Sequence, residues 1–263
     1  MALRSRTPSL FRPKRPVDQG VLAEHRTLVA DIDRRGVLRG AVSLGALTLL
    51  TGCDVTEEEP VQKVLRAVSS WNDGVQEALF RPGHMAPTFS PAQVVKPPRF
   101  NAHYDIEEVK PVDGATWKLE LSGLIKDKRP WTVAELYQLP EQEMIIKHIC
   151  VEGWDYIGQW SGVNLRAFLE RIGADTTAKY VAFRCADDYT ESLDMASALH
   201  PQSMLATKYA REPIADPYGF PLRLRTATKL GFKNAKWVTA IEVTNDFPDT
   251  YYRKEGFNWF AGI

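Results

Sequence analysis

The sequence predicts an α+β fold, because the apolar patterns of helix and strand follow one another in mixed order rather than in regular alternation. No Gly-rich dinucleotide fingerprint follows a strand, which argues against a doubly wound nucleotide-binding fold. The chain has 263 residues, of which 44% are hydrophobic, so it can bury a sizeable core. We expect one compact domain with an N-terminal appendage.

Residues 1–53 have the character of an export signal. The first 30 residues are basic and contain several prolines, with no core-building pattern. Arg34 and Arg35 then precede an apolar run at residues 41–50, which is too short to span a bilayer. This order is typical of a twin-arginine signal, so we expect export to the periplasm.

The signal ends at Cys53, which gives it a second interpretation. Leu50-Thr51-Gly52-Cys53 resembles a lipoprotein box, in which Cys53 would become the lipidated first residue. Several acyl chains on one cysteine hold a protein stably at a membrane. Asp54 would favour retention at the inner membrane, by analogy with enteric lipoproteins. The alternative is that the two arginines belong to a buried amphipathic helix and that Cys53 is an ordinary small residue.

Residues 54–99 are predicted to form a helix followed by an extended linker. Glu57-Glu58-Glu59-Pro60 suits a first helical turn, because carboxylates and proline are both favoured there. Apolar residues then recur at helical spacing, namely Val61, Val64, Leu65, Val68, Trp71 and Val75. The proline-containing stretch at residues 81–98 is expected to wrap a surface or to link elements.

The compact domain is predicted to span residues 100–263. Thr132 and Glu135 form the pattern of a capping box at the start of a short helix, and Gly173 follows the apolar stripe of a second helix. Strands are expected at residues 117–123, 179–185, 222–228 and 237–243, and a central one precedes Gly153.

The central strand carries the residues of greatest chemical interest. Because side chains alternate along a strand, we expect His148, Cys150 and Glu152 to share one face. The chain has three cysteines, so Cys150 could be an inert core residue or could pair with Cys185. It could also be a nucleophile with His148 as its base. A zinc site is a poorer prediction, because one strand rarely supplies a closed tetrahedral shell.

A cluster of cations lies between Asp216 and Glu242, and no acidic residue occurs in residues 217–241. Its members are Arg223, Arg225, Lys229, Lys233 and Lys236. Cations set among glycines suit a phosphate group, although a solvated basic face would give the same pattern. The chain as a whole has 33 basic and 33 acidic residues, so no global field attracts it to nucleic acid.

Several ordered motifs carry a resemblance to a known family. They are Cys150-Val151-Glu152-Gly153-Trp154, Trp160-Ser161-Gly162-Val163-Asn164-Leu165, Lys179-Tyr180-Val181-Ala182-Phe183, Gly219-Phe220-Pro221-Leu222-Arg223-Leu224 and Gly231-Phe232-Lys233-Asn234-Ala235-Lys236. From about Asn101 onwards the chain resembles the molybdopterin-binding domain of the sulfite oxidase family, especially its periplasmic methionine sulfoxide reductase branch. The resemblance implies mixed β-sheets with peripheral helices and a molybdenum-molybdopterin cofactor.

The resemblance also implies roles for individual residues. Cys150 would bind molybdenum through its thiolate, a soft donor that suits this metal. Glu152 would be a proton-transfer group near the metal or a structural carboxylate, and His148 receives no role. The implied cofactor-binding residues are Asn101, Tyr104, Asp105, Cys185, Tyr218, Arg223, Asn234, Ala235 and Lys236. Two of these depart from the pattern, because Cys185 replaces a threonine and Tyr218 an asparagine.

The implied function is that of an exported oxidoreductase that transfers an oxygen atom and reduces sulfoxides, including oxidised methionine in proteins. A sulfite-oxidising enzyme and a cofactor-free scaffold lipoprotein of the same fold are the alternatives. The sequence contains no heme-attachment motif, so a membrane heme protein or a soluble cytochrome would serve as the redox partner. We expect a monomer.

Overall fold

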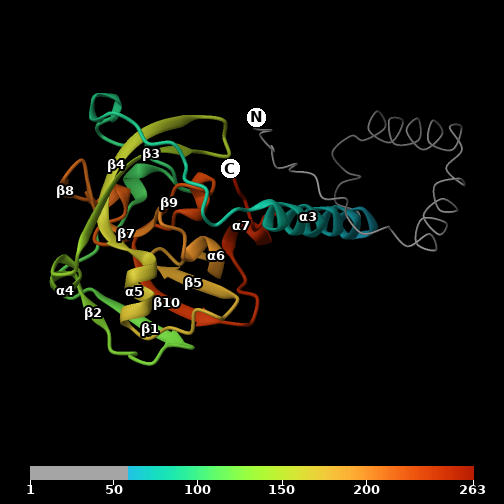
Figure 1. The fold of residues 1–263 in the computed structure, drawn as a ribbon. Coiled ribbons are helices and arrows are strands. Elements are labelled where there is room, and N and C mark those ends of the chain that lie inside the picture. The colour runs from blue at the N-terminus through green and yellow to red at the C-terminus, as the bar shows by residue number, and fades with distance from the viewer. Residues whose placement is uncertain (1–58) are drawn as a thin grey trace, which may run out of the picture. The chain divides into compact units, whose positions relative to one another are not determined.

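The computed structural model describes residues 59–263. The predicted export signal, with its paired arginines and Cys53, therefore lies outside the described residues. The chain divides into two compact units, Met1–Gln62 and Lys63–Ile263. Almost all of the described chain belongs to the second unit, which holds two β-sheets and several short helices (Figure 1).

The first sheet has five strands in the order β2-β1-β10-β5-β6. Its strands are β1 (Lys118–Gly123), β2 (Trp131–Thr132), β5 (Tyr180–Cys185), β6 (Thr190–Asp194) and β10 (Val238–Thr244). Strands β1 and β10 run parallel, whereas the other neighbours are antiparallel. This mixture confirms the predicted α+β class with mixed sheets.

The second sheet has the order β3-β4-β7-β8, with β9 paired to β7. Its strands are β3 (Glu141–Ile149), β4 (Asp155–Asn164), β7 (Ser203–Tyr209), β8 (Glu212–Pro213) and β9 (Arg223–Thr226). Strands β3 and β4 form a long hairpin that arches over the top of Figure 1, with Ile149 opposite Asp155. All of these strands are antiparallel to their neighbours. Strand β3 was predicted from the sequence, whereas β4 was not.

The helices are short apart from one. They are α3 (Glu59–Leu79), α4 (Val133–Tyr137), α5 (Leu165–Arg171), α6 (Met195–Ala198) and α7 (Tyr251–Lys254), with 3₁₀ turns η2 (Pro91–Gln93), η3 (Ile106–Glu108), η4 (Asp216–Tyr218) and η5 (Gly231–Lys233). The predicted capping box is confirmed, because Thr132 Oγ1 accepts from the Glu135 amide at 3.3 Å and the Glu135 carboxylate accepts from the Thr132 amide at 2.9 Å.

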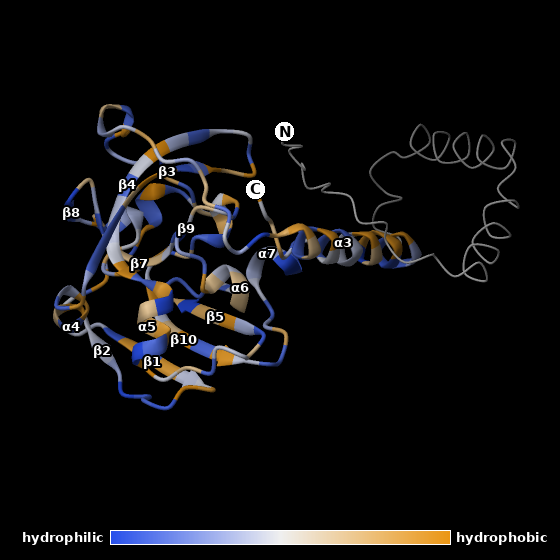
Figure 2. Cartoon of the chain, in the orientation of Figure 1, coloured by the Kyte–Doolittle hydropathy of each residue, from blue (hydrophilic) through white to orange (hydrophobic). Residues whose placement is uncertain are grey.

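Alternation of side chains produces two hydrophobic clusters. The larger one packs the first sheet against α5, with Phe168 and Leu169 fully buried. The smaller one lies beneath the β3–β4 hairpin and contains Ile146, Tyr156 and Trp160. Strand residues accordingly change between hydrophilic and hydrophobic along their length in Figure 2. The hairpin is thus fixed on its inner side, which positions the turn that joins its two strands.

Candidate active site

Cys150 is the first residue of the turn that joins β3 to β4. Its backbone amide donates to the carbonyl of Trp154 at 2.9 Å, and the Gly153 amide donates to the Cys150 carbonyl at 3.1 Å. Gly153 has a φ of +87°, a conformation that side chains rarely adopt. The turn also brings the backbone amides of Val151 and Glu152 to the Cys150 thiol.

The Cys150 thiol is free and buried, with 8% of the residue exposed. Cys185 is free as well, so the predicted alternative of a disulfide between them is wrong. Burial raises the pKa of the Cys150 thiol, which the two turn amides and Arg99 counteract in part. A thiol in such surroundings is a poor nucleophile by itself, whereas a bound metal would stabilise its thiolate.

The predicted grouping of His148, Cys150 and Glu152 on one face is wrong. Strand β3 ends at Ile149, so the alternation of side chains does not continue through the turn. His148 is fully buried, whereas Glu152 is exposed and its carboxylate accepts from the Trp154 indole at 2.6 Å. Neither ring nitrogen of His148 has a hydrogen-bond partner among residues 59–263, so the Cys–His pair and the zinc site are not formed.

The five cations of the predicted cluster are all buried, so the alternative of a solvated basic face is wrong. Their exposed fractions are 1% for Arg223, 1% for Arg225, 2% for Lys229, 1% for Lys233 and 8% for Lys236. A buried charge is costly unless a partner neutralises it. The partners of the five cations therefore show what each of them does.

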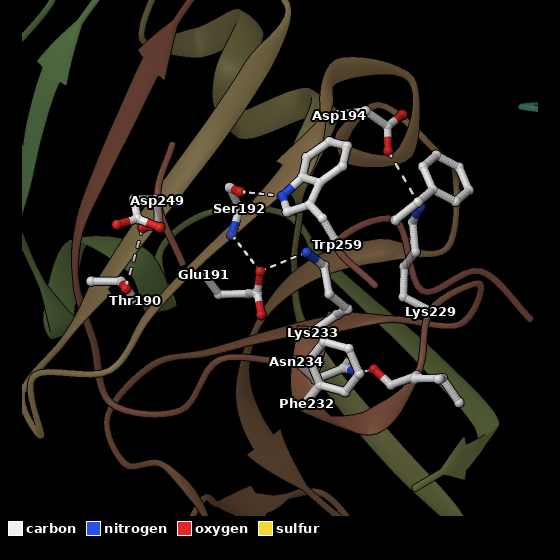
Figure 3. A network of polar contacts seen from close by, with 12 residues as sticks. Thr190, Glu191, Ser192, Asp194, Lys229, Phe232, Lys233, Asn234, Asp249 and Trp259 are labelled. Carbon is white, nitrogen blue, oxygen red and sulfur yellow. Dashed lines mark hydrogen bonds and ion pairs between the residues drawn. The ribbon is translucent and has the colours of Figure 1, made fainter. Parts of the chain in front are cut away.

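Two of these cations form ion pairs inside the protein. Lys229 Nζ lies 3.3 Å from the Asp194 carboxylate, and Lys233 Nζ lies 2.5 Å from that of Glu191 (Figure 3). Both carboxylates come from β6, and the Trp259 indole donates to the neighbouring Ser192 hydroxyl at 2.7 Å. These pairs attach the segment around η5 to the first sheet. They leave neither lysine free for a ligand.

The other three cations have no carboxylate within ion-pair distance in the described part of the chain. Arg223 donates once, to the Tyr218 carbonyl at 3.1 Å, and its Nε and Nη2 have no partner. Arg225 donates to the Asn234 side chain at 2.6 Å and to a carbonyl of β3, but its Nε has no partner. Lys236 donates to the Asn101 carbonyl at 2.6 Å. Burial, and then the charge of nearby Arg223, lower the pKa of Lys236 to about 6.

Other buried polar atoms near these cations also have no partner among residues 59–263. They are Asn101 Oδ1, both ring nitrogens of His148, Tyr156 Oη and Trp160 Nε1. The His148 ring stacks on Tyr156 with centroids 5.0 Å apart, and the Arg223 guanidinium lies 4.9 Å from the Trp160 ring. Burial raises the pKa of the Tyr156 hydroxyl. Arg223 and Arg225 lower this pKa and Cys150 raises it, so all three lie within electrostatic reach of the hydroxyl. Unsatisfied polar atoms and the thiol therefore occupy one region.

One pocket collects four of the predicted cofactor-binding residues. They are Asn101, Asn234, Ala235 and Lys236. Tyr252 also lines this pocket, and its hydroxyl lies within electrostatic reach of Cys150 and Glu152. Tyr252 therefore lies between the pocket and the surroundings of the thiol.

The remaining predicted residues lie around this pocket or at its margin. Tyr104 donates to the Asp187 carboxylate at 2.9 Å, and Asp187 lines the pocket. Cys185 is buried, and burial followed by the charge of Asp187 raises its pKa. The backbone carbonyl of Tyr218 accepts a hydrogen bond from Arg223. Asp105 is exposed at the N-cap position of η3, and its side chain makes no capping hydrogen bond.

Three site residues were not assigned from the sequence. Tyr156 and Trp160 lie in β4, where aromatic residues usually belong to the core, and Arg225 was identified only as one member of the cationic cluster. The spacing of the arginines two residues apart on β9 was the available signal, because it places both side chains on one face of a strand.

A buried free thiol in the same region as unpaired buried arginines is suited to binding an anionic group together with a soft metal. Residues 105–252 match the sequence model of the oxidoreductase molybdopterin binding domain family. The chain belongs to this family, and it is an oxidoreductase with a molybdenum-molybdopterin cofactor.

Similar proteins support the assignment. A protein of Azospira oryzae with the provisional name protein-methionine-sulfoxide reductase subunit YedZ1 is 48% identical over 229 residues, which are 87% of each chain. The protein-methionine-sulfoxide reductase catalytic subunits MsrP of Campylobacter jejuni and Xanthomonas campestris are 28% and 32% identical. Those matches cover 56% and 51% of this chain and 56% and 47% of the relatives, so the chain spans about half the length of either MsrP.

One solved structure matches more distantly. The sulfane dehydrogenase SoxCD of Paracoccus pantotrophus has 18% identity and a TM-score of 0.49, over 52% of this chain and 40% of that one.

The residues of the site fit the cofactor of this family. Cys150 would supply one soft sulfur for the metal, and Arg223, Arg225 and Lys236, the last once an anion favours its protonated form, would supply positive charge for the phosphate. The unpaired atoms of Tyr156, Trp160 and His148 can bond the polar edge of an organic ring system. The cofactor thus accounts for buried donors that the described chain leaves unsatisfied.

Replacement of Arg223 should separate cofactor binding from folding. We expect Arg223→Met to lower the cofactor content by about tenfold or more, because charge-assisted hydrogen bonds are lost. The cofactor-free domain should become more resistant to urea, because an unpaired buried charge disappears. Pterin fluorescence after release and urea titration measure the two effects. Arg184→Met, on the exposed side of β5, is the control; equal cofactor contents in both variants would contradict this role.

The cofactor-free protein should lose stability as the pH falls. The pKa of Lys236 is about 6 in the folded state and 10.5 when unfolded, so between these values only the unfolded chain binds the proton. We expect the urea midpoint to decrease from about pH 9 to about pH 7, and Lys236→Met to reduce the decrease. If the urea midpoint changed equally with pH in the wild type and in Lys236→Met, the burial of an uncharged amine at Lys236 would be contradicted.

Proposed function

We propose that this oxidoreductase reduces sulfoxides, with oxidised methionine side chains of proteins as its main substrate class. The observation that supports the proposal is the buried, free thiol of Cys150 in the region of the unpaired Arg223 and Arg225, in a chain whose relatives carry the name of methionine sulfoxide reductase. The overall reaction takes up two electrons and two protons, and it converts the sulfoxide to a thioether and water.

The cofactor, when bound, supplies two-electron redox chemistry at its metal. The chain supplies the surroundings. Cys150 would hold the metal by its thiolate, and the buried cations, of which Lys236 lines the pocket, would neutralise the phosphate. The exposed Glu152 follows Cys150 in the same turn, so its carboxylate can carry protons between solvent and the reacting oxygen.

The proposed redox partner is a heme protein in the membrane or a soluble cytochrome. The chain has no heme-attachment motif of its own, so its electrons must come from another protein. None of the helices in residues 59–263 is both long and apolar enough to cross a membrane. We further propose export to the periplasm by the twin-arginine signal and attachment through Cys53.

Replacement of the proposed metal ligand tests the core of this function. We expect Cys150→Ser to abolish sulfoxide reduction and the Mo(V) resonance signal, because the hydroxyl is a poor donor for the metal. The fold should persist, since the turn is held by backbone hydrogen bonds. Val151→Ala changes the exposed neighbour and should retain both properties. A wild-type resonance signal in Cys150→Ser would refute the assignment.

The substrate class is tested with the loaded enzyme and a chemical electron donor. We expect turnover of methionine sulfoxide in a peptide and of small sulfoxides, and little oxidation of sulfite with an electron acceptor. Kinetics with both substrate types decide between the two reactions. Efficient sulfite oxidation with inert sulfoxides would contradict the proposal.

A further inference from the structure

The long helix α3 presents an apolar stripe to solvent. Five side chains make up this stripe: Val64 is 62% exposed, Leu65 49%, Val68 56%, Trp71 70% and Leu79 73%. None of the residues of α3 is buried, and its hydrophobic residues run along the whole helix in Figure 2. A contiguous exposed apolar surface of this kind marks an interaction site.

The polar side of the same helix is already used to hold it in place. The Asp73 carboxylate accepts from the backbone amides of Trp259 at 3.1 Å and Phe260 at 2.9 Å. The Gln76 side chain accepts from the Gly262 amide at 2.9 Å. The helix is therefore fixed by its polar side, and its apolar stripe cannot turn inward without loss of these bonds.

The charges of α3 are separated from the stripe. At 3.6 residues per turn, the apolar positions 61, 64, 65, 68, 71, 75 and 79 cover an arc of about 120°. The charged residues Lys63, Arg66, Asp73 and Glu77 fall on the opposite half of the helix. An arc this wide exceeds the seam of a two-stranded coiled coil, and it suits contact with a broad apolar surface such as a membrane interface.

The apolar surface continues beyond the helix. Leu79 lines a groove together with Phe80, His84 and Ile263. His84 and Ile263 also line a second, mainly apolar groove, whose wall includes Ile149, the residue before Cys150. The stripe and the two grooves thus lead from α3 to the end of β3.

We propose that the α3 stripe binds the surface of a lipid bilayer. Only residues 54–58 separate α3 from Cys53 and the apolar run at residues 41–50. A segment of that length reaches about 20 Å at most when fully extended. Attachment of the chain to a membrane at Cys53 or at the apolar run would therefore bring α3 to the bilayer surface, where Trp71 suits the interface.

The proposal is tested with the full chain and vesicles of phosphatidylethanolamine and phosphatidylglycerol that contain brominated lipid. Bromine quenches tryptophan only within the bilayer, so we expect a loss of fluorescence that is absent in Trp71→Phe. Quenching should persist at high salt, because the charges of α3 lie on the other side. This readout follows α3 itself, whatever the leader does.

A matched pair of variants locates the contact. Val68→Glu places a charge within the stripe, whereas Ser70→Glu places it on the opposite exposed side. We expect the first to abolish quenching of Trp71 and the second to retain it. Sulfoxide reduction in solution should be unchanged in both, which separates this proposal from that of function. Unquenched Trp71 in the wild type, or a stripe covered by a second copy in a lipid-free dimer, would overturn the proposal.

Discussion

Unpaired positive charge buried near the Cys150 turn is the constraint on which the site depends. Arg223 and Arg225 are enclosed by protein and stay charged, whereas burial lowers the pKa of the neighbouring Lys236 to about 6; the partners of all three in residues 59–263 are carbonyl and amide oxygens only. Such a cluster weakens the domain unless an anion arrives from outside. Binding of an anionic cofactor thus offsets a cost already present in the fold, which couples cofactor insertion to stability.

The surrounding structure keeps these groups in position without neutralising them. The β3–β4 hairpin delivers Cys150 from one side, and its backbone amides rather than a base surround the sulfur. From the other side, the pairs of Lys229 with Asp194 and of Lys233 with Glu191 fix the segment that carries Asn234 to Lys236. Cations with carboxylate partners and cations without them are therefore neighbours in sequence.

Much of this could be predicted from local patterns. The fold class and the capping box at Thr132 follow from residue types and spacing, whereas the role of Cys150 rests on the resemblance to the family and stays a prediction. The sequence does not reveal which cations of the cluster form ion pairs, because Asp194 precedes Lys229 by 35 residues and Glu191 precedes Lys233 by 42. The exposure of Glu152 was also missed, since strand alternation was extended through a turn that begins at Cys150. Contacts between distant segments and the end of a strand are decided by tertiary packing.

The most direct test is a crystal structure of the protein loaded with its cofactor. We expect phosphate or ring oxygens of the cofactor within hydrogen-bond distance of Arg223 Nε and Nη2, and the metal bound to the sulfur of Cys150. A cofactor that leaves both arginine nitrogens without a partner, or a metal bound away from Cys150, would contradict the account.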